Sequence, residues 1–482
     1  MRSYVNCALD EAERQGVEFA DFRMVEQRIG HVYVRDRSVK SIGLDHDFGY
    51  SVRVLKDGAW GLASSTDITP EEVARTARRA VEVARASARA PKDPPATMVP
   101  EKAHEAMRQG PCQEDPFEVP DREKAELLLD ACDTMLGVDG IARARGALRF
   151  IRRWRTIGTT DGTFVHLAHH FAEPILEATA VIGGESQTRS LQCGAKQAGY
   201  EYIREADLPN QAEEIAKEAV LKAEAEETPE GVMDLVLDPE NLALTMHETV
   251  GHPTESDRIL GWEANMAGRS FIRPSDIGSL RYGSDIVNFT VDNTMEEGLG
   301  SWFYDDDGVP MQKFPLVRRG VLQDVGLTRE TAALLGRDRS NGCCRSDSFA
   351  RFPINRIPNL YLEAGPDFSI TPEDLIADVE RGIYIAGRGS WSIDQMRRNF
   401  QFGGDMFWMI ENGRLTHPLK KVTYQSQTTD FWQSCEALAN RDHWRAHGVM
   451  NCGKGEPTQV MFMTHGASHG LFREIEVGGS RR

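Results

Sequence analysis

Segments typical of strands and segments typical of helices follow one another along this chain without a regular alternation. Residues 25–55 and 148–202 are rich in β-branched and aromatic side chains and are interrupted by turn signals such as Thr160-Asp161-Gly162-Thr163. Helical patterns occupy residues 6–15, 67–90, 122–136 and 211–227. Because a parallel βαβ sheet requires strands and helices in strict alternation, this order predicts an α+β fold of mixed sheets with packed helices.

The sharpest break in the pattern is Thr228-Pro229-Glu230-Gly231, which follows the charged helix of residues 211–227. A chain of 482 residues is long enough for two large domains. We therefore expect an N-terminal α+β domain over residues 1–228 and a C-terminal domain over residues 232–482.

Composition excludes several classes of function. The chain carries 74 acidic and 56 basic side chains, a formal charge of −18, which disfavours binding to nucleic-acid phosphates. No run approaches the ~18 consecutive apolar residues of a membrane span, and the first residues lack the apolar segment of a signal peptide. The eight cysteines are scattered, without a CxxC pair. We expect a reduced, cytoplasmic protein that binds neither nucleic acid nor membrane.

A short run near the start of the second domain has the composition of a metal site. His247 and His252 lie five positions apart, and Glu248 follows the first. In the common zinc-peptidase motif His-Glu-x-x-His, the imidazoles at i and i+4 share one helix face. At i and i+5 they would diverge by about 140° on a regular helix.

Two residues of this run favour a local change in the helix. Pro253 lacks a backbone donor and pushes the preceding residue toward extended dihedrals, while Gly251 tolerates unusual ones. We expect the helix to unwind here or to widen into a π-type turn, which would bring the two imidazoles together. Otherwise His247 is an ordinary half-buried histidine and Glu248 a surface charge.

A catalytic zinc site also requires a third protein ligand and an open position. Cys452 is the candidate, because it lies in a glycine-flanked loop and the nearby Lys454 would favour its thiolate. The alternative is a buried cysteine that acts as a small hydrophobe. His465 and His469, spaced i and i+4 in a glycine-rich stretch, are competing donors. As acceptors for the ring N–H groups of ligating histidines, the sequence offers Glu255 and Asp257.

These motifs, together with others in the same order along the chain, resemble the TldD/PmbA family of metalloproteases, on its motif-bearing TldD side. The stretches that carry the likeness are GYSVRVLKDGAWGLASSTDIT (49–69), HETVGHPTESD (247–257), EANMAGR (263–269), GLGSWFYDDDGVP (298–310), PINRIPNLYLEAG (353–365), GIYIAGRGSW (382–391), FGGDMFWMIENGRL (402–415) and CGKG (452–455). The residues after CGK depart from the common family form, so no role for His465 or His469 carries over.

The resemblance implies a zinc-dependent metallopeptidase that hydrolyses peptide bonds in unfolded or flexible peptides. Motif-bearing members use two histidines and a downstream cysteine as zinc ligands, which correspond to His247, His252 and Cys452. The glutamate corresponds to Glu248, as general base for a zinc-bound water. The resemblance also implies a homodimer, or a heterodimer with a PmbA/TldE-like subunit. The N-terminal domain would then enclose the substrate and scaffold the dimer, with the metal site in the C-terminal metalloprotease domain.

Several alternatives remain open at this point. The chain could be a non-catalytic binding or regulatory subunit of a peptidase complex, or a metal-dependent hydrolase of another small substrate. The acidic run at residues 305–307 could bind calcium, but it lacks the glutamate spacing of an EF-hand and is better interpreted as a solvated turn. Weak candidates for stabilising an oxyanion are Tyr304, Arg345, Arg351 and His417.

Overall fold

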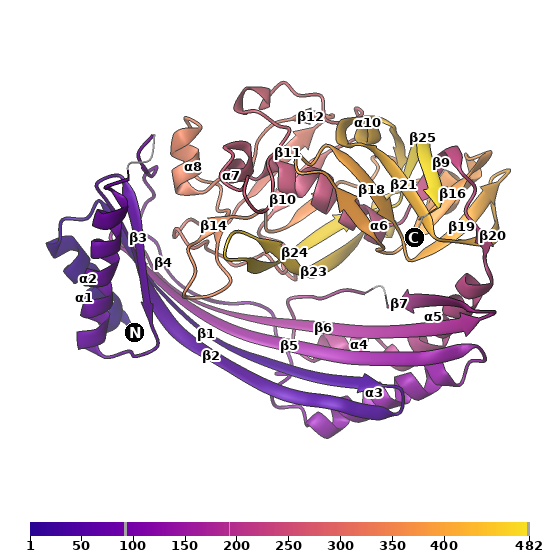
Figure 1. The fold of residues 1–482 in the computed structure, drawn as a ribbon, viewed down its shortest axis with the longest axis horizontal. Helices are drawn as coiled ribbons and strands as arrows, with labels where there is room; N and C mark the ends of the chain where they lie inside the picture. The colour runs from indigo at the N-terminus through magenta and orange to yellow at the C-terminus, as the bar shows by residue number, and fades with distance from the viewer. Residues whose placement is uncertain (91–93, 192, 480–482) are drawn as a thin grey trace.

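The structure of the chain is a computed structural model, which describes residues 1–90, 94–191 and 193–479. A long curved sheet from the first half of the chain lies beneath a compact body formed by the second half (Figure 1). The fold is therefore α+β with mixed sheets, as the irregular order of segments predicts. No helix in the described part of the chain is both long and apolar enough to cross a membrane.

The two strand-rich regions of the first half form the long sheet. Its strands lie in the order β3 (Ala59–Ser65), β2 (Ser38–Lys56), β1 (Phe19–Arg35), β5 (Ile141–Thr159), β6 (Phe164–Ile182) and β4 (Glu105–Gln109), with β7 (Glu185–Ser190) paired to β6. The turn at residues 160–163 joins β5 to β6, as predicted. All neighbours are antiparallel except β4 and β6.

Helices cover this sheet where its apolar side chains would otherwise be exposed. They are α1 (Arg2–Arg14), α2 (Pro70–Ser87), α3 (Asp121–Leu136), α4 (Glu201–Glu205) and α5 (Leu208–Glu224). The first two pack on β1 and β2 at one end, and α3 and α5 pack on β5 and β6. Thr69 caps α2, since its side chain accepts a hydrogen bond from the backbone N–H of Glu72.

The second half builds further sheets. One has the order β17 (Trp391–Ile393), β18 (Asn399–Gly403), β21 (Val422–Gln427), β25 (Gly470–Gly479), β9 (Gly231–Leu237), β16 (Arg381–Ala386), β19 (Met406–Glu411), β20 (Arg414–Lys420) and β8 (Glu226–Glu227), with β22 (Cys435–Leu438) paired to β25. Another has the order β12 (Val321–Leu322), β11 (Lys313–Arg318), β10 (Phe289–Asp292), β15 (Leu360–Leu362), β24 (Gln459–Ala467) and β23 (Arg445–Lys454). A short pair consists of β13 (Cys344–Arg345) and β14 (Ile354–Asn355).

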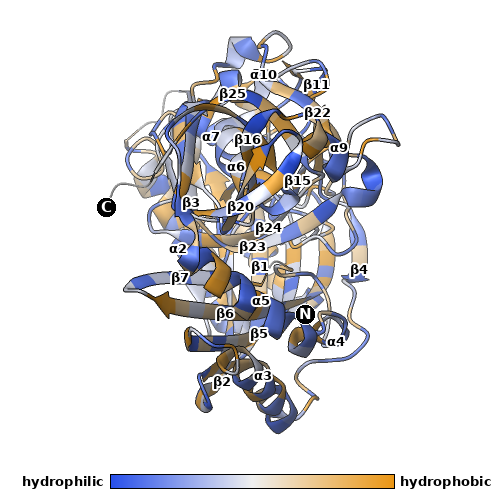
Figure 2. Cartoon of the chain, turned by 90° about the vertical axis from the view of Figure 1, so that its right-hand side faces the viewer, coloured by the Kyte–Doolittle hydropathy of each residue, from blue (hydrophilic) through white to orange (hydrophobic). Residues whose placement is uncertain are grey.

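The helices of this half are short. They are α6 (Pro239–Met246), α7 (Ser256–Ile259), α8 (Arg329–Leu334), α9 (Pro372–Ala377) and α10 (Thr428–Gln433). Helix α6 belongs to the large apolar core of this half, where Leu242 and Met246 are fully buried among strand residues. Figure 2 shows this contrast in hydropathy, with hydrophobic strands such as β16 inside and hydrophilic helices such as α2 and α9 at the surface.

A buried group of charges joins the long sheet to the body above it. The sequence predicts a solvated turn at residues 305–307, but all three aspartates are buried. The prediction is wrong because arginines of the long sheet neutralise the turn. Arg53 lies 2.7 Å from Asp307, and Arg155 pairs with Asp306. Local sequence could not reveal partners that come from strands more than 100 residues away.

Candidate metal centre

The helix that carries the first histidine widens at the predicted position. Asp238 caps α6 by accepting a hydrogen bond from the backbone N–H of Asn241 at 2.7 Å. A π-helix follows over His247–Gly251, and the backbone N–H of His252 bonds to the carbonyl of His247, five residues earlier. The predicted π-type turn is therefore confirmed. It places the imidazoles of His247 and His252 with ring centroids 4.6 Å apart.

The effect expected of Pro253 on its neighbour is wrong in detail. His252 is helical, with φ −67° and ψ −42°, and it begins a 3-10 turn over His252–Thr254. The wide π-turn accommodates the proline ring without extending the backbone before it. The carbonyl four residues back, that of Thr249, accepts a hydrogen bond from the buried hydroxyl of Tyr282 and is not left unpaired.

The third donor arrives from β23, at the edge of its sheet. A bulge between Val449 and Cys452 interrupts the ladder with β24, and such bulges re-aim side chains. The Sγ of Cys452 lies 3.4 Å from Nε2 of His252. One ring nitrogen from each of His247 and His252 and this sulfur all lie within 4.8 Å of one another, and all three residues are buried.

Both imidazoles have the protonation that metal binding requires. His465, on β24, is buried, and its Nδ1 lies 3.2 Å from the carbonyl of Leu360, which can only accept a hydrogen bond. Burial lowers the pKa of His465 well below its ordinary value, so the ring is neutral and its Nε2 is an acceptor. That nitrogen lies 2.7 Å from Nδ1 of His247, which must therefore be the donor. The lone pair of His247 is left on Nε2.

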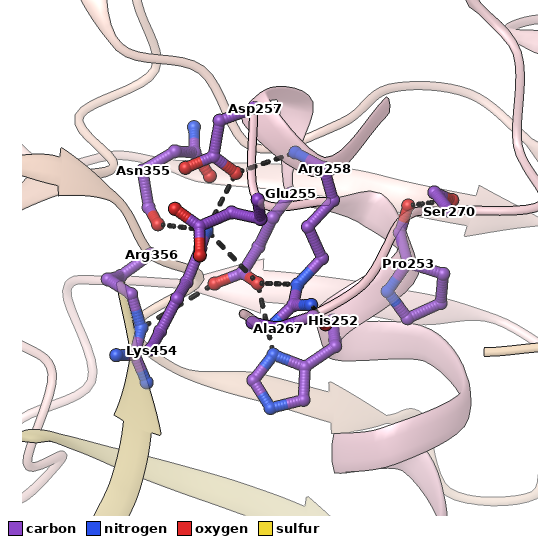
Figure 3. A network of polar contacts seen from close by, with 12 residues as sticks. His252, Pro253, Glu255, Asp257, Arg258, Ala267, Ser270, Asn355, Arg356 and Lys454 are labelled. Atoms are coloured by element: carbon purple, nitrogen blue, oxygen red, sulfur yellow. Dashed lines mark hydrogen bonds and ion pairs between the residues drawn. The ribbon is translucent and has the colours of Figure 1, made fainter. Parts of the chain in front are cut away.

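A carboxylate fixes the second imidazole in the same way. Glu255 accepts a hydrogen bond from Nδ1 of His252 at 3.0 Å, so Nε2 of His252 also keeps a free lone pair. Figure 3 shows that Glu255 lies at the centre of a buried network, where the same oxygen is 2.8 Å from Arg258 and 3.3 Å from Lys454. Although burial would raise it, the pKa of Glu255 is held well below its ordinary value by Lys454, His252 and Arg258.

Two details of this network differ from the sequence analysis. Asp257 does not contact an imidazole, because its carboxylate pairs with Lys454 at 2.6 Å. Lys454 is thereby engaged with carboxylates, and Arg356 takes the expected place beside the sulfur, 2.7 Å from Sγ of Cys452. Burial alone would raise the pKa of the Cys452 thiol, but nearby positive charge, chiefly that of the Arg356 guanidinium, outweighs burial and lowers it.

The candidate general base faces a cavity of about 600 Å³ between β6 and the body of the second half. Glu248 lines this cavity together with His247, His252 and Cys452. Its Oε2 accepts a hydrogen bond from Nη1 of Arg397 at 2.6 Å. A larger hollow of about 770 Å³ is lined by Tyr361 and Trp444 among others, but the His/Cys cluster found among the described residues belongs to the smaller cavity.

The remaining candidates lie elsewhere. His469 stacks on Tyr384, with its Nε2 3.3 Å from the hydroxyl of that tyrosine. The residues suggested for stabilising an oxyanion do not line the cavity: they are Tyr304, Arg345, Arg351 and His417. Sequence reasoning missed Arg397, in the turn between β17 and β18, and Arg356, directly after β14; each lies more than 90 residues from its partner in the chain.

Comparison with known proteins shows which proteins this chain is similar to. The chain matches the model of the PmbA/TldA metallopeptidase C-terminal domain over residues 230–479 and that of domain 1 over residues 20–84. A protein of Methanothermobacter thermautotrophicus named metalloprotease is 27% identical over 470 residues, 96% of each chain. A protein of Saccharolobus solfataricus named zinc metalloprotease TldD homolog is 22% identical over 98% of this chain and 99% of its own.

A solved structure shares the fold over its whole length. TldE from Thermococcus kodakarensis superposes with a TM-score of 0.73 at 16% identity, covering 99% of each chain or more. Because the C-terminal model spans more than half of the chain, the protein belongs to the PmbA/TldA metallopeptidase family, the same family that its motifs resemble.

Proposed function

We propose that this protein is a zinc-dependent metallopeptidase that hydrolyses peptide bonds in unfolded or flexible peptides. His247, His252 and Cys452 would hold the zinc, and Glu248 would act as general base. The observation that carries the proposal is the convergence of these three buried donor atoms to within 4.8 Å of one another, beside Glu248, in one cavity.

The chemistry of the donors fits zinc. Two neutral imidazoles and a thiolate are ligands that zinc commonly takes, and three protein ligands leave a position open for reaction. Each imidazole already has its Nδ1–H engaged, by His465 or by Glu255, which leaves Nε2 of each ring for the metal. A zinc ion held there would supply Lewis-acid chemistry that activates water and polarises a peptide carbonyl.

The side chains around this site have separate tasks. Arg356 stabilises the thiolate of Cys452 and draws negative charge from the sulfur, which offsets the weakening of Lewis acidity by an anionic ligand. Glu248 accepts the proton of the attacking water and returns it to the leaving amine. Because Glu248 adjoins His247 in the π-helix, its carboxylate is held next to the metal position.

The cavity supports a flexible substrate. It lies between residues 173–177 of β6 and the α6 region, and its volume of about 600 Å³ suits a short length of extended chain. Such a cavity would admit a flexible segment more readily than a folded protein. The same logic supports a cytoplasmic location, since such a filter would spare folded proteins, and all eight cysteines are free.

We also propose that the protein acts as a dimer, either with itself or with a PmbA/TldE-like subunit. The likeness of motifs to the TldD/PmbA family supports this proposal, and the fold shared with TldE is compatible with it. Purified protein that cleaves peptides without a partner would favour the homodimer and would exclude a purely regulatory subunit.

Substitution of Glu248 tests the proposed function. Glu248→Gln should retain one zinc per chain and lose peptide cleavage by about 100-fold or more, because proton transfer contributes 10²–10⁴-fold. Cys452→Ser should lose zinc, whereas Cys7→Ser, at a free thiol outside the site, should keep both zinc and activity. Zinc content by atomic absorption and cleavage of a quenched fluorescent peptide are measured together. Full turnover by Glu248→Gln would end the proposal.

A further inference from the structure

The turn between β17 and β18 places one arginine against the candidate general base. We propose that Arg397 is a positioning residue, which holds the carboxylate of Glu248 so that one oxygen faces the reacting water. The inference rests on the proposed function, because it assigns a role to Arg397 only if Glu248 acts as the base.

The contact with Arg397 engages one of the two carboxylate oxygens of Glu248 and leaves the other available. Nη1 of Arg397 donates to Oε2 of Glu248 at 2.6 Å, and both side chains are largely buried. Within the described part of the chain, Arg397 is the hydrogen-bond partner that the structure gives this carboxylate, so Oε1 stays available to accept a proton. A carboxylate without such a partner could rotate about its last torsion. Small misplacements of a catalytic group cost up to about 100-fold in rate.

Hydrogen bonds fix the conformation of the turn that carries Arg397. Asp394 accepts hydrogen bonds from the backbone N–H groups of Met396 and Asn399, each at 3.0 Å. The backbone of Met396 in turn accepts from Phe271 at 2.9 Å, and the hydroxyl of Thr428 donates to the carbonyl of Arg397 at 2.8 Å. The backbone from which the Arg397 side chain extends is therefore held by hydrogen bonds to segments on both sides.

Arg397 occupies an unfavourable backbone conformation. Its φ is +62°, in the left-handed region where glycine is favoured and other side chains are strained. Its Nε is also buried and has no hydrogen-bond partner among the residues that the structure describes. A residue chosen only to close the turn would be glycine, which avoids both costs. Strain of this kind gathers where a side chain is required for function, and here the side chain reaches Glu248.

The competing explanation is that Arg397 has a purely structural role. Nη2 of Arg397 donates to the carbonyl of Ala267 at 3.2 Å, so the side chain also ties the turn to a neighbouring loop. If that tie were its role, its loss would loosen the site as a whole and would alter metal binding. If positioning is its role, its loss would act on the rate and leave the metal in place.

Arg397→Gly separates these explanations, because glycine suits the dihedrals of the turn and should preserve its shape. The matched control is Arg398→Gly, in the same turn, where an exposed side chain donates to Gln427. We expect Arg397→Gly to lower kcat by about 10–100-fold, with KM within about twofold of wild type. Zinc stoichiometry and the visible spectrum of the cobalt-substituted protein should match wild type. Arg398→Gly should match wild type in every measurement.

Two further measurements complete the test. Added guanidinium ion should restore part of the kcat of Arg397→Gly, and Arg397→Lys should have an intermediate kcat, because lysine keeps the charge without the planar fork. The double variant with Glu248→Gln should be no slower than Glu248→Gln alone, since both act through one carboxylate.

The outcomes are distinguishable. Wild-type kcat in Arg397→Gly, or loss of zinc and a changed cobalt spectrum, would overturn the positioning role while leaving the proposed function intact. The same holds if guanidinium gives no rescue. If Glu248→Gln itself turns over at the wild-type rate, the proposed function fails first. Should Arg397→Gly not fold, Arg397→Lys decides the question through its kcat at unchanged zinc content.

Discussion

Replacement of Glu255 by Gln removes one negative charge from the middle of a buried network while keeping the shape of the side chain. The carboxylate of Glu255 neutralises Arg258 at 2.8 Å and Lys454 at 3.3 Å, and it accepts the ring N–H of His252. Nearly the whole side chain is buried. The substitution leaves these cations in place without their shared counter-charge.

The magnitude follows from the burial. Breaking a buried ion pair by removing one partner costs about 3–5 kcal/mol, because the other charge is left uncompensated. Asp257 still pairs with Lys454 at 2.6 Å, and glutamine keeps one acceptor oxygen, so the lower part of that range applies. For a unit of about 250 residues this corresponds to a fall in Tm of roughly 6–15 °C. Loss of the acceptor for His252 should also weaken zinc binding by about 10–100-fold.

Thermal unfolding and a zinc competition titration measure the two effects separately. The matched control is Glu126→Gln, where an exposed glutamate pairs with the exposed Arg122 at 2.6 Å. A solvent-exposed pair of this kind contributes little to stability, so the control should stay close to wild type. A second variant, Glu255→Gln with Arg258→Met, also removes the cation whose ion pair is with Glu255 and should recover part of the stability. Wild-type Tm and zinc affinity in Glu255→Gln would refute this account of the network.

Two further substitutions test other parts of the structure. His465→Phe removes the hydrogen-bond acceptor of His247 and should lower zinc affinity by about 10–100-fold, measured by competition with a chelator. His465→Gln should recover part of that affinity. Equal zinc affinity in wild type and both variants would contradict a role for the hydrogen bond between His247 and His465. For Asp306, burial alone would raise the pKa, but Arg155 and Arg23 outweigh it and hold the pKa below its ordinary value. A lowered pKa in the folded state stabilises fully above the unfolded value of about 3.9, and this contribution is lost as pH falls through the folded value. Asp306→Asn should therefore be less stable at neutral pH and should lose less stability on acidification, followed by Tm from about pH 7 to about pH 3; parallel curves for both proteins would contradict this.

The two histidines of the candidate site could be proposed from the sequence because their signal is local. The spacing of His247, Glu248 and His252 is visible in one short run, and the effect of Gly251 and Pro253 on a helix follows from their backbone chemistry. The π-turn could therefore be predicted from the sequence. The helical dihedrals of His252 could not be predicted, because they depend on how far the preceding turn widens, which the local sequence does not show.

The arginines of the site were beyond prediction for a different reason. Arg356 lies 96 residues from Cys452 in the chain, and Arg397 lies 149 residues from Glu248. An arginine that makes such a contact has no periodic pattern in the sequence that would identify it. What marks Arg397 instead is a conflict between residue type and conformation, since a hairpin turn with a left-handed position normally takes glycine there. Such a conflict becomes visible only when dihedrals are known. Chemistry carried by short motifs can thus be read from the chain, whereas the groups that orient it must be found where the backbone is strained and a charge is buried.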